Sequence, residues 1–332
     1  MVVSASPRVA VVIPSYRVTR HVLGVIERIG PEVERIYVVD DACPDGSGEH
    51  VAKHGSDPRV RVIRHTENGG VGAAVVSGYR AAIEEGMDIV VKIDGDGQMD
   101  PALLPSFIDP ILRGEADYAK GNRFWDLRHI RRMPGVRRWG NLGLSFMAKA
   151  STGYWDLFDP TNGYTALSVP VAALLPLDSL SRRYFFETDL LFRLGTLRAA
   201  VVDVPMDAFY GDETSHLDVR RAVFEFAAKH LRNFGKRVSY NYFLRDLSIA
   251  SLELVAAVLL IAFALAFGGY HWLLSIQSGT PATVGTVMLP ALAMVSGLQF
   301  LLAFLAYDIG TMPRRALHPL LSASRRRLEA RR

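Results

Sequence analysis

The sequence predicts an α/β domain built on a mostly parallel sheet with flanking helices, followed by an interfacial amphipathic helix and two transmembrane helices. Three observations support this prediction: strand and helix patterns alternate in residues 1–216, an amphipathic segment follows at 217–246, and two long apolar runs come after it. Charged residues make up 22% of the 332-residue chain, but they lie mainly before the apolar runs. The two parts of the chain are therefore expected to occupy different environments.

Short runs rich in β-branched residues alternate with helical segments in the first domain. Strands are expected at residues 8–13, 35–39, 60–65 and 88–93. Helices are expected at residues 18–29, 48–53, 72–85 and 102–113. This alternation is typical of βαβ units, whose parallel strands share one sheet. Ligands of such sheets bind beyond the carboxyl ends of the strands, so the residues that follow each strand are candidates for a site.

The residues that follow the fourth predicted strand are unusually acidic. Asp94 and Asp96 are two positions apart, and the amide of Gln98 follows at the same spacing. Oxygen ligands of this kind suit Mg²⁺ or Mn²⁺ and leave coordination positions for substrate phosphate. The segment therefore predicts a divalent metal site that would stabilise charge on a departing nucleotide diphosphate.

Other interpretations explain this acidic segment less well. An EF-hand loop also begins with alternating acids, but it requires Gly at its sixth position and Glu at its twelfth, where Met99 and Pro105 stand. Asp100 before Pro101 fits a helix N-cap, but capping does not require the two acids that precede it.

The glycine-rich stretch NGGVGAA, residues 68–74, resembles a dinucleotide-binding loop. It follows the third predicted strand rather than the first, and Val75 stands where the third glycine is expected. A Rossmann oxidoreductase is therefore the weaker alternative, and a tight turn that leads into a helix explains these glycines better.

Two apolar runs, residues 247–268 and 284–307, are each long enough to cross a bilayer as a helix. Glu253 is the only charged residue in the two runs. The alternative is a pair of buried core helices. Before them, residues 218–234 show apolar positions at helical spacing among arginines and lysines, which fits a helix in the headgroup layer or one packed on the first domain.

Basic residues flank the two apolar runs, whereas the loop between them, residues 269–283, contains no Lys or Arg. This distribution predicts a multi-pass protein of the cell membrane, with the large domain, both termini and the basic tail 308–332 in the cytoplasm and the loop outside. Because the cations follow the membrane boundaries, no nucleic-acid partner is expected. Cys43 is the single cysteine, so an internal disulfide framework is excluded.

Seven motifs, taken in order, resemble those of family 2 glycosyltransferases of the GT-A fold. They are VVIPSY, VVDDACPDGSG, NGGVGAA, IDGDGQMDP, KGNRF, DPTNGYTAL and FFETDLLFRL, within residues 8–217. The likeness is strongest to dolichol-phosphate mannose synthase and bacterial polyprenyl-phosphate glycosyltransferases. It implies an inverting hexosyltransferase that moves a sugar from a UDP- or GDP-sugar to polyprenyl or dolichyl phosphate at the cytoplasmic membrane face. Mg²⁺ or Mn²⁺ is the implied cofactor, and a homo-oligomer is compatible with the resemblance.

Carried across position by position, the resemblance implies roles for individual residues. The donor nucleotide would be bound by Pro14, Tyr16, Val39, Asp41 and Asp94. The metal would be bound by Asp94, Asp96 and Gln98. The acceptor phosphate would be bound by Arg123, Arg137 and Asn141. Catalytic roles would fall to Asp96, Asp159, Glu187 and Asp189.

Three positions depart from the family's pattern. Arg17 and Val18 stand where Asn-Glu is usual, and the serine expected near Asn141 is absent. Residues 210–217 read YGDETSHL where the family often has an arginine-rich loop that ends in Gly-Glu-Ser-Lys-Leu. These departures bear on the donor sugar and nucleotide more than on the class of reaction.

Two other functions fit parts of the sequence. A processive polysaccharide synthase shares the GT-A core, but it usually has more spans and a Q-x-x-R-W motif, and Gly135 stands at the glutamine position before Arg138 and Trp139. A non-catalytic, membrane-tethered nucleotide-sugar-binding protein would fit the missing glutamate after Tyr16.

Overall fold

The computed structural model describes residues 6–125, 135–207 and 219–329. The chain divides into two compact units: unit 1 is Met1–Phe234 with Pro313–Arg332, and unit 2 is Gly235–Met312. Unit 2 is therefore inserted within unit 1 along the sequence.

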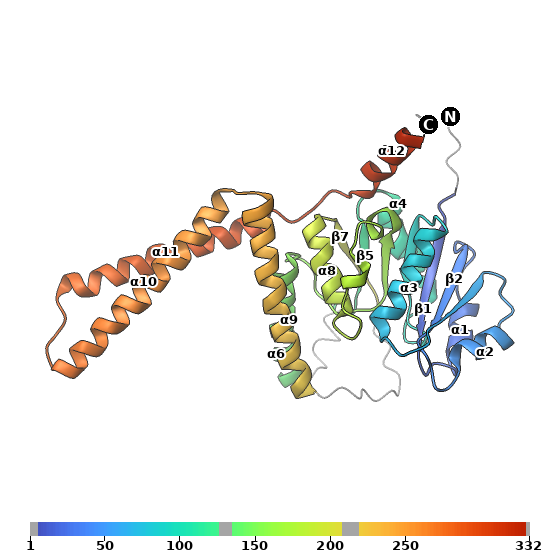
Figure 1. Cartoon of the computed structure of the whole chain (residues 1–332), viewed down its shortest axis with the longest axis horizontal. Coiled ribbons are helices and arrows are strands. Elements are labelled where there is room, and N and C mark those ends of the chain that lie inside the picture. The colour runs from blue at the N-terminus through green and yellow to red at the C-terminus, as the bar shows by residue number, and fades with distance from the viewer. Residues whose placement is uncertain (1–5, 126–134, 208–218, 330–332) are drawn as a thin grey trace. The chain divides into compact units, whose positions relative to one another are not determined.

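Unit 1 contains a seven-stranded sheet with helices on both of its faces (Figure 1). The strands are β1 (Val9–Ser15), β2 (Arg35–Asp40), β3 (Val60–Arg64), β4 (Ile89–Lys92), β5 (Tyr118–Asn122), β6 (Thr165–Ser168) and β7 (Val201–Pro205). Their spatial order is β3-β2-β1-β4-β6-β5-β7. Only β6 runs antiparallel to its two neighbours, so the prediction of a mostly parallel sheet is confirmed.

The helices of unit 1 divide between the two faces. Their bounds are α1 (Val22–Glu27), α2 (Ser47–His54), α3 (Val71–Glu84), α4 (Leu104–Leu112), α6 (Gly135–Thr152), α7 (Val169–Ala172), α8 (Phe186–Leu197), α9 (Val219–Ser239) and α12 (His318–Glu329), with short 3₁₀ turns at Pro101–Leu103 and Leu177–Ser179. Residues of α3, α7 and α8 form the core on one face, and residues of α1, α2 and α4 form the core on the other. Both faces are buried because β1, β2 and β4 are nearly continuous apolar runs, whose successive side chains point to opposite faces of the sheet.

The four predicted strands correspond to β1–β4, and each of the four predicted helices overlaps a helix of the structure. The strands β5, β6 and β7 were not predicted. For β5 and β6 the reason lies in their composition, since YAKGN and TALS lack the run of β-branched residues by which the first four strands were identified. β7 reads VVDVP and has such a run, so its composition does not explain why it was missed.

One face of α9 packs on the rest of unit 1. His230 and Asn233 are buried, and the His230 Nδ1 atom lies 2.8 Å from the Ser151 Oγ atom of α6. Phe224 and Leu231 are exposed. The amphipathic pattern of this helix therefore reflects packing on the domain along one side, and leaves apolar side chains on another.

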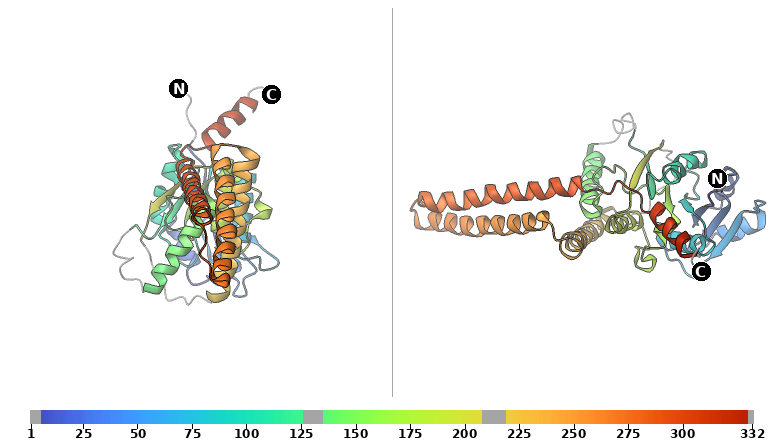
Figure 2. Two further views of the ribbon diagram at one scale, coloured as in Figure 1. Left: turned by 90° about the vertical axis from the view of Figure 1, so that its left-hand side faces the viewer. Right: turned by 90° about the horizontal axis from the view of Figure 1, so that it is seen from above.

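Unit 2 contains two long apolar helices, α10 (Ile249–Ser278) and α11 (Val284–Gly310), which lie side by side as a hairpin (Figure 2). Their most apolar windows have mean hydropathies of 2.5 and 2.0, so both are long and apolar enough to cross a membrane. The first helix continues past residue 268, the end expected from the sequence, and stops at Gly279, whose φ of 65° ends a helix readily. Gly297 allows close packing, because a Cβ there would lie 3.1 Å from the Ile261 backbone nitrogen.

At the base of this hairpin, Asp308 of α11 is buried and fully paired. It accepts two hydrogen bonds from the Arg237 guanidinium, at 2.7 and 2.9 Å, and one from the Tyr242 hydroxyl at 2.5 Å. Tyr242 belongs to the π-helical turn Tyr240–Arg245, which precedes α10. This network ties the two ends of unit 2 together, because Arg237 and Asp308 lie close to its two chain boundaries.

Candidate active site

The candidate residues of the first two strands lie where β1 and β2 end. In the register of the sheet, Pro14 pairs with Val39 and Ser15 pairs with Asp40. Tyr16 is 43% exposed, whereas the Val39 side chain is fully buried. A ligand at this edge could therefore contact the ring of Tyr16, but it could contact Val39 only through the main chain.

Asp41 is a buried acid that is bonded to the main chain. Its carboxylate accepts hydrogen bonds from the backbone nitrogens of Gly69 at 2.9 Å and Gly70 at 2.7 Å. The His65 Nδ1 atom lies 2.7 Å from the same carboxylate. These contacts fix the loop that follows β3 to the end of β2, so Asp41 has a structural role whatever it contributes to nucleotide binding.

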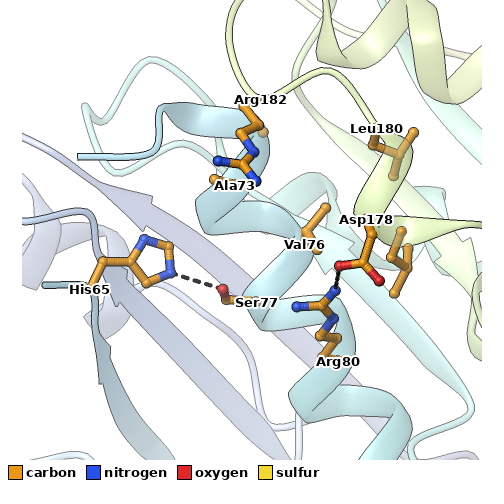
Figure 3. A pocket seen from close by; sticks show the side chains of 10 residues that line it. His65, Ala73, Val76, Ser77, Arg80, Asp178, Leu180 and Arg182 are labelled. Carbon is orange, nitrogen blue, oxygen red and sulfur yellow. Dashed lines mark hydrogen bonds and ion pairs between the residues drawn. The ribbon is translucent and has the colours of Figure 1, made fainter. Parts of the chain in front are cut away.

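His65 also borders a cavity, which Figure 3 shows. Its Nε2 atom lies 2.8 Å from the Ser77 Oγ atom of α3 (Figure 3). The cavity has a volume of about 130 Å³, and its wall includes Arg182 and the ion pair between Arg80 and Asp178. A second cavity of about 410 Å³ adjoins the loop of residues 64–69. None of the acids of residues 94–100 lines either cavity.

At the tip of β4, the buried ammonium group of Lys92 lies between two acids. Its Nζ atom is 2.8 Å from Asp94 Oδ1, 3.3 Å from Glu187 Oε1 and 3.1 Å from the Gly163 carbonyl oxygen. Burial alone would lower the pKa of Lys92, but the charges of Asp94 and Glu187 raise it above its ordinary value. Lys92 was not a sequence candidate, although a lysine in the apolar strand IVVK was a signal that could have identified it.

Asp96 and Gln98 lie in the turn that follows β4. The Gln98 backbone nitrogen donates a 2.9 Å hydrogen bond to Asp96 Oδ1, and Gly97 between them has a φ of +79°, which favours glycine. Asp94 and Asp96 are both partly exposed. Across the described part of the chain, no three His, Cys, Asp or Glu side chains form a complete metal-binding group. These carboxylates are therefore a partial ligand set, to which the Gln98 amide could be added.

Arg123 follows β5 and is held by Asp159 of the DPTNGY loop. The Arg123 Nε and Nη2 atoms donate to the two Asp159 oxygens at 2.8 and 3.0 Å. Burial alone would raise the pKa of Asp159, but the hydrogen bonds from Arg123 and the charge of Lys120 hold it below its ordinary value. Asp159 is therefore ionised, and it orients the guanidinium group of Arg123.

The two acids of α8 have different neighbours. Glu187 faces Lys92, whereas Asp189 accepts a 2.9 Å hydrogen bond from the Ser181 backbone nitrogen and a 3.3 Å bond from the Asn233 side chain of α9. Asp189 therefore fixes α8 to a loop and to α9. Glu187 is the acid of this helix that lies beside the tip of β4.

A second buried lysine, Lys120, lies in the same row of the sheet as Lys92. Both residues pair with Thr165 of β6, and Lys120 also pairs with Asp203 of β7. Burial lowers the pKa of Lys120 to about 8. The sequence did not indicate this residue either, because a lysine in a short strand normally predicts an exposed position.

The structure does not describe the side chains of all candidate residues. The side chains of Arg137 and Asn141 belong to the first turns of α6, where the structure describes only the backbone. Residues 126–134 and 208–218, which include the whole of the departing YGDETSHL segment, lie outside the described residues. The structure therefore brings together Asp94, Lys92 and Glu187, and separately pairs Arg123 with Asp159.

The sequence and the fold are similar to those of known proteins. A Glycosyl transferase family 2 profile matches residues 10–173. An undecaprenyl-phosphate mannosyltransferase of Micrococcus luteus is 31% identical over 204 residues, which is 60% of this chain and 82% of the relative. A polyprenol monophosphomannose synthase of Mycolicibacterium smegmatis is 30% identical over 243 residues, which is 69% of this chain and 89% of that relative.

Among solved structures, a glucosyl-3-phosphoglycerate synthase of Mycobacterium tuberculosis in complex with Mn²⁺, UDP-glucose and phosphoglyceric acid has a similar fold. The TM-score is 0.53 and the sequence identity is 20%, with 70% of this chain and 79% of that chain covered. At this identity the likeness bears on the fold alone, which is GT-A-like. The family profile and the two relatives lead to one conclusion: the chain belongs to glycosyl transferase family 2 and is a glycosyltransferase.

Proposed function

We propose that the protein transfers a hexose from a nucleoside diphosphate sugar to a polyprenyl or dolichyl phosphate, with inversion at the anomeric carbon. The observation that carries this proposal is the meeting of two segments at one edge of the sheet. Because β4 and β5 both run antiparallel to β6, the acids of residues 94–98 and the arginine after β5 follow strands that end at the same edge. Relatives that act on lipid phosphates support the choice of acceptor.

The donor half of this edge suits a divalent metal. Asp94, Asp96 and Gln98 offer hard oxygen ligands, and a nucleotide diphosphate would supply further oxygens. Similar structures that contain Mn²⁺ or Mg²⁺ with UDP support this assignment. The bound metal would stabilise the negative charge of the leaving diphosphate, while the chain would hold the nucleotide beside Tyr16 and the ends of β1 and β2.

The acceptor half requires cations more than a strong base. A phosphate monoester has a second pKa of about 6, so at neutral pH its oxygen is already largely ionised and able to attack. Arg123 would bind this phosphate, and Arg137 and Asn141 are proposed to assist it. A guanidinium group suits the role because it can contact two phosphate oxygens at once. Asp159 is better suited to orient Arg123 than to accept a proton, because its pKa is lowered.

The membrane assignment rests on α10 and α11. We propose that both helices span the cell membrane, with unit 1 on the cytoplasmic side. The support is the distribution of charge, since arginines and lysines flank the hairpin and the connection between its helices has none. A lipid-phosphate acceptor would then be presented at the surface near which the catalytic unit is anchored.

A transfer assay on the purified full-length chain in nanodiscs tests this proposal. Labelled UDP- and GDP-sugars are offered with a short polyprenyl phosphate and Mn²⁺, and the linkage of any product is determined by NMR. We expect one sugar per lipid, of inverted configuration, and no product in the presence of EDTA. A growing polymer would instead support a polysaccharide synthase, and nucleotide-sugar binding without turnover would support a non-catalytic protein.

A further inference from the structure

We propose that Lys92 is a positioning residue, which holds the Asp94 and Glu187 carboxylates in the mutual arrangement that sugar transfer requires. The inference rests on the proposed function for the roles of those two acids. Asp94 belongs to the donor and metal segment, and Glu187 belongs to the helix assigned to the acceptor side. Lys92 connects the two halves of the site through a single ammonium group.

The geometry uses the whole hydrogen-bonding capacity of the lysine. An ammonium group has three donors and no acceptor. Lys92 has three oxygen partners within 3.3 Å, from Asp94, Glu187 and Gly163, which belong to three separate segments of the chain. Its side chain is 2% exposed, so water does not compete for these donors. The direction of each carboxylate is therefore determined by the position of Lys92.

The negative charges of the two acids explain why a cation is needed between them. The Glu187 side chain is 11% exposed and the Asp94 side chain is 29% exposed. Without a cation between them, two poorly hydrated carboxylates would repel each other and turn apart. We therefore expect loss of Lys92 to move Asp94 away from the position in which it can hold a metal-bound nucleotide.

The loop that carries Gly163 is shaped around this contact. A Cβ atom at Gly163 would lie 2.5 Å from the Lys92 Nζ atom and 2.7 Å from Asp94 Oδ2. The Lys92 ammonium group has little freedom to move aside, because it is buried and paired with both acids. Glycine at this position thus allows the DPTNGY loop to close over Lys92 and to place its carbonyl oxygen on the ammonium group.

Lys120 provides a matched control. It is fully buried, it lies on the same face of the sheet, and it pairs in register with the same threonine as Lys92. Its Nζ atom donates only a long 3.5 Å hydrogen bond to Gly121 O, and it has no ion pair with an acid among the described residues. Replacing either lysine with methionine removes one buried charge, but only Lys92→Met releases Asp94 and Glu187.

The first experiment measures binding and requires no lipid. Calorimetry gives the affinity of the full-length protein for UDP and GDP with and without Mn²⁺, and the ratio defines the enhancement by metal. We expect Lys92→Met and Lys92→Gln to reduce this enhancement at least tenfold, Lys92→Arg to recover part of it, and Lys120→Met to stay within threefold of the wild type. An unchanged or larger enhancement in Lys92→Met, or an equal loss in Lys120→Met, would overturn the proposal.

The second experiment measures coupling between Lys92 and Glu187. The loss of kcat caused by Glu187→Gln is determined in the wild type, in Lys92→Met and in Lys120→Met. If Lys92 positions Glu187, this loss shrinks at least tenfold in the Lys92→Met background and keeps its full size in the Lys120→Met background. Equal losses in all three backgrounds would show that the two residues act independently.

The two experiments separate this inference from the proposed function. If the wild type binds nucleotide with Mn²⁺ but transfers sugar to no polyprenyl phosphate, the proposed acceptor is wrong, and the binding ratio still tests Lys92. If transfer occurs and the binding ratio is insensitive to Lys92, the proposed function holds and the positioning role is wrong.

Discussion

The two edges of the sheet in unit 1 hold acids in opposite ways. At the amino edge, Asp117 is fully buried and accepts backbone hydrogen bonds from Ala200, Leu317 and His318, each at 2.8 to 2.9 Å. At the carboxyl edge, Asp94 is held by one ammonium group and keeps 29% of its side chain exposed. An acid saturated by main-chain donors can serve only the fold, whereas an acid held from one side can also bind a ligand.

The largest expected effect lies at the carboxyl edge. Asp96→Ala removes a proposed metal ligand, so we expect transfer to fall about 10³-fold, the order of effect of losing one transition-state contact. The measurement is the initial rate of glycolipid formation at saturating Mn²⁺. Asp100→Ala is the control, because that acid caps the 3₁₀ turn before α4. It should cost about 1 kcal/mol of stability and leave the rate near that of the wild type.

A substitution at the amino edge should lower stability and leave ligand binding intact. Asp117→Ala leaves several buried donors without a partner, so we expect it to lower the free energy of unfolding by about 3 kcal/mol. Folded protein should retain Mn²⁺-dependent nucleotide binding. Asp178→Ala, which removes an acid with a 91% exposed side chain, should change stability by less than about 0.5 kcal/mol. Loss of nucleotide binding in folded Asp117→Ala would contradict the division between the two edges.

Gly163→Ala tests the close packing of the DPTNGY loop against Lys92 and Asp94 at the carboxyl edge. The added methyl group has no room beside Lys92 and Asp94. A displacement of about 1 Å in a catalytic group can lower the rate about 10²-fold, and we expect a loss of that order. Gly24→Ala is the matched change, since nothing lies within 4 Å of a Cβ atom there. Because Gly24 lies within α1, alanine should stabilise the protein by up to about 1 kcal/mol and leave transfer unchanged.

The smallest expected effect involves neither edge of the sheet. It tests whether the stability of the protein depends on pH through a residue of α9. Burial lowers the pKa of His230 to about 4, so the native state resists its protonation. Unfolded chains bind that proton below a pH of about 6.5, so stability is complete above this pH and is lost as the pH falls towards 4.

Between pH 7 and pH 5 the stability lost through His230 amounts to about 2 kcal/mol. Unfolding of the full-length chain, followed across this range, gives the measurement. His230→Gln should show a flatter dependence on pH, and a slope equal to that of the wild type would assign the effect to other groups.

The sequence predicted the strands β1–β4 better than the strands β5–β7, for physical reasons. The strands β1, β2 and β4 are nearly continuous apolar runs, because both of their faces are covered. In β5, the positions that face one core are Tyr118, Lys120 and Asn122, so the usual apolar signal is missing. β6 has only four residues and runs antiparallel to its neighbours.

The candidate site shows the same division. Motif spacing was enough to place the acids of residues 94–98 after the fourth strand. It could not indicate Lys92 or Lys120, because a lysine is buried only when distant segments bring carboxylates or a closed core around it. Glu187 and Gly163 follow Lys92 by many residues in the chain, and that contact depends on the completed tertiary structure.

The contact of Asp117 with Leu317 and His318 has a consequence for the biosynthesis of the protein. Unit 1 contains the strands of the sheet, yet Leu317 and Leu321, which pack against its core, follow α11 in the chain. Domains usually fold in the order in which they are translated. This one cannot be finished until both apolar helices have emerged, so targeting of the ribosome to a membrane would precede the maturation of the enzyme.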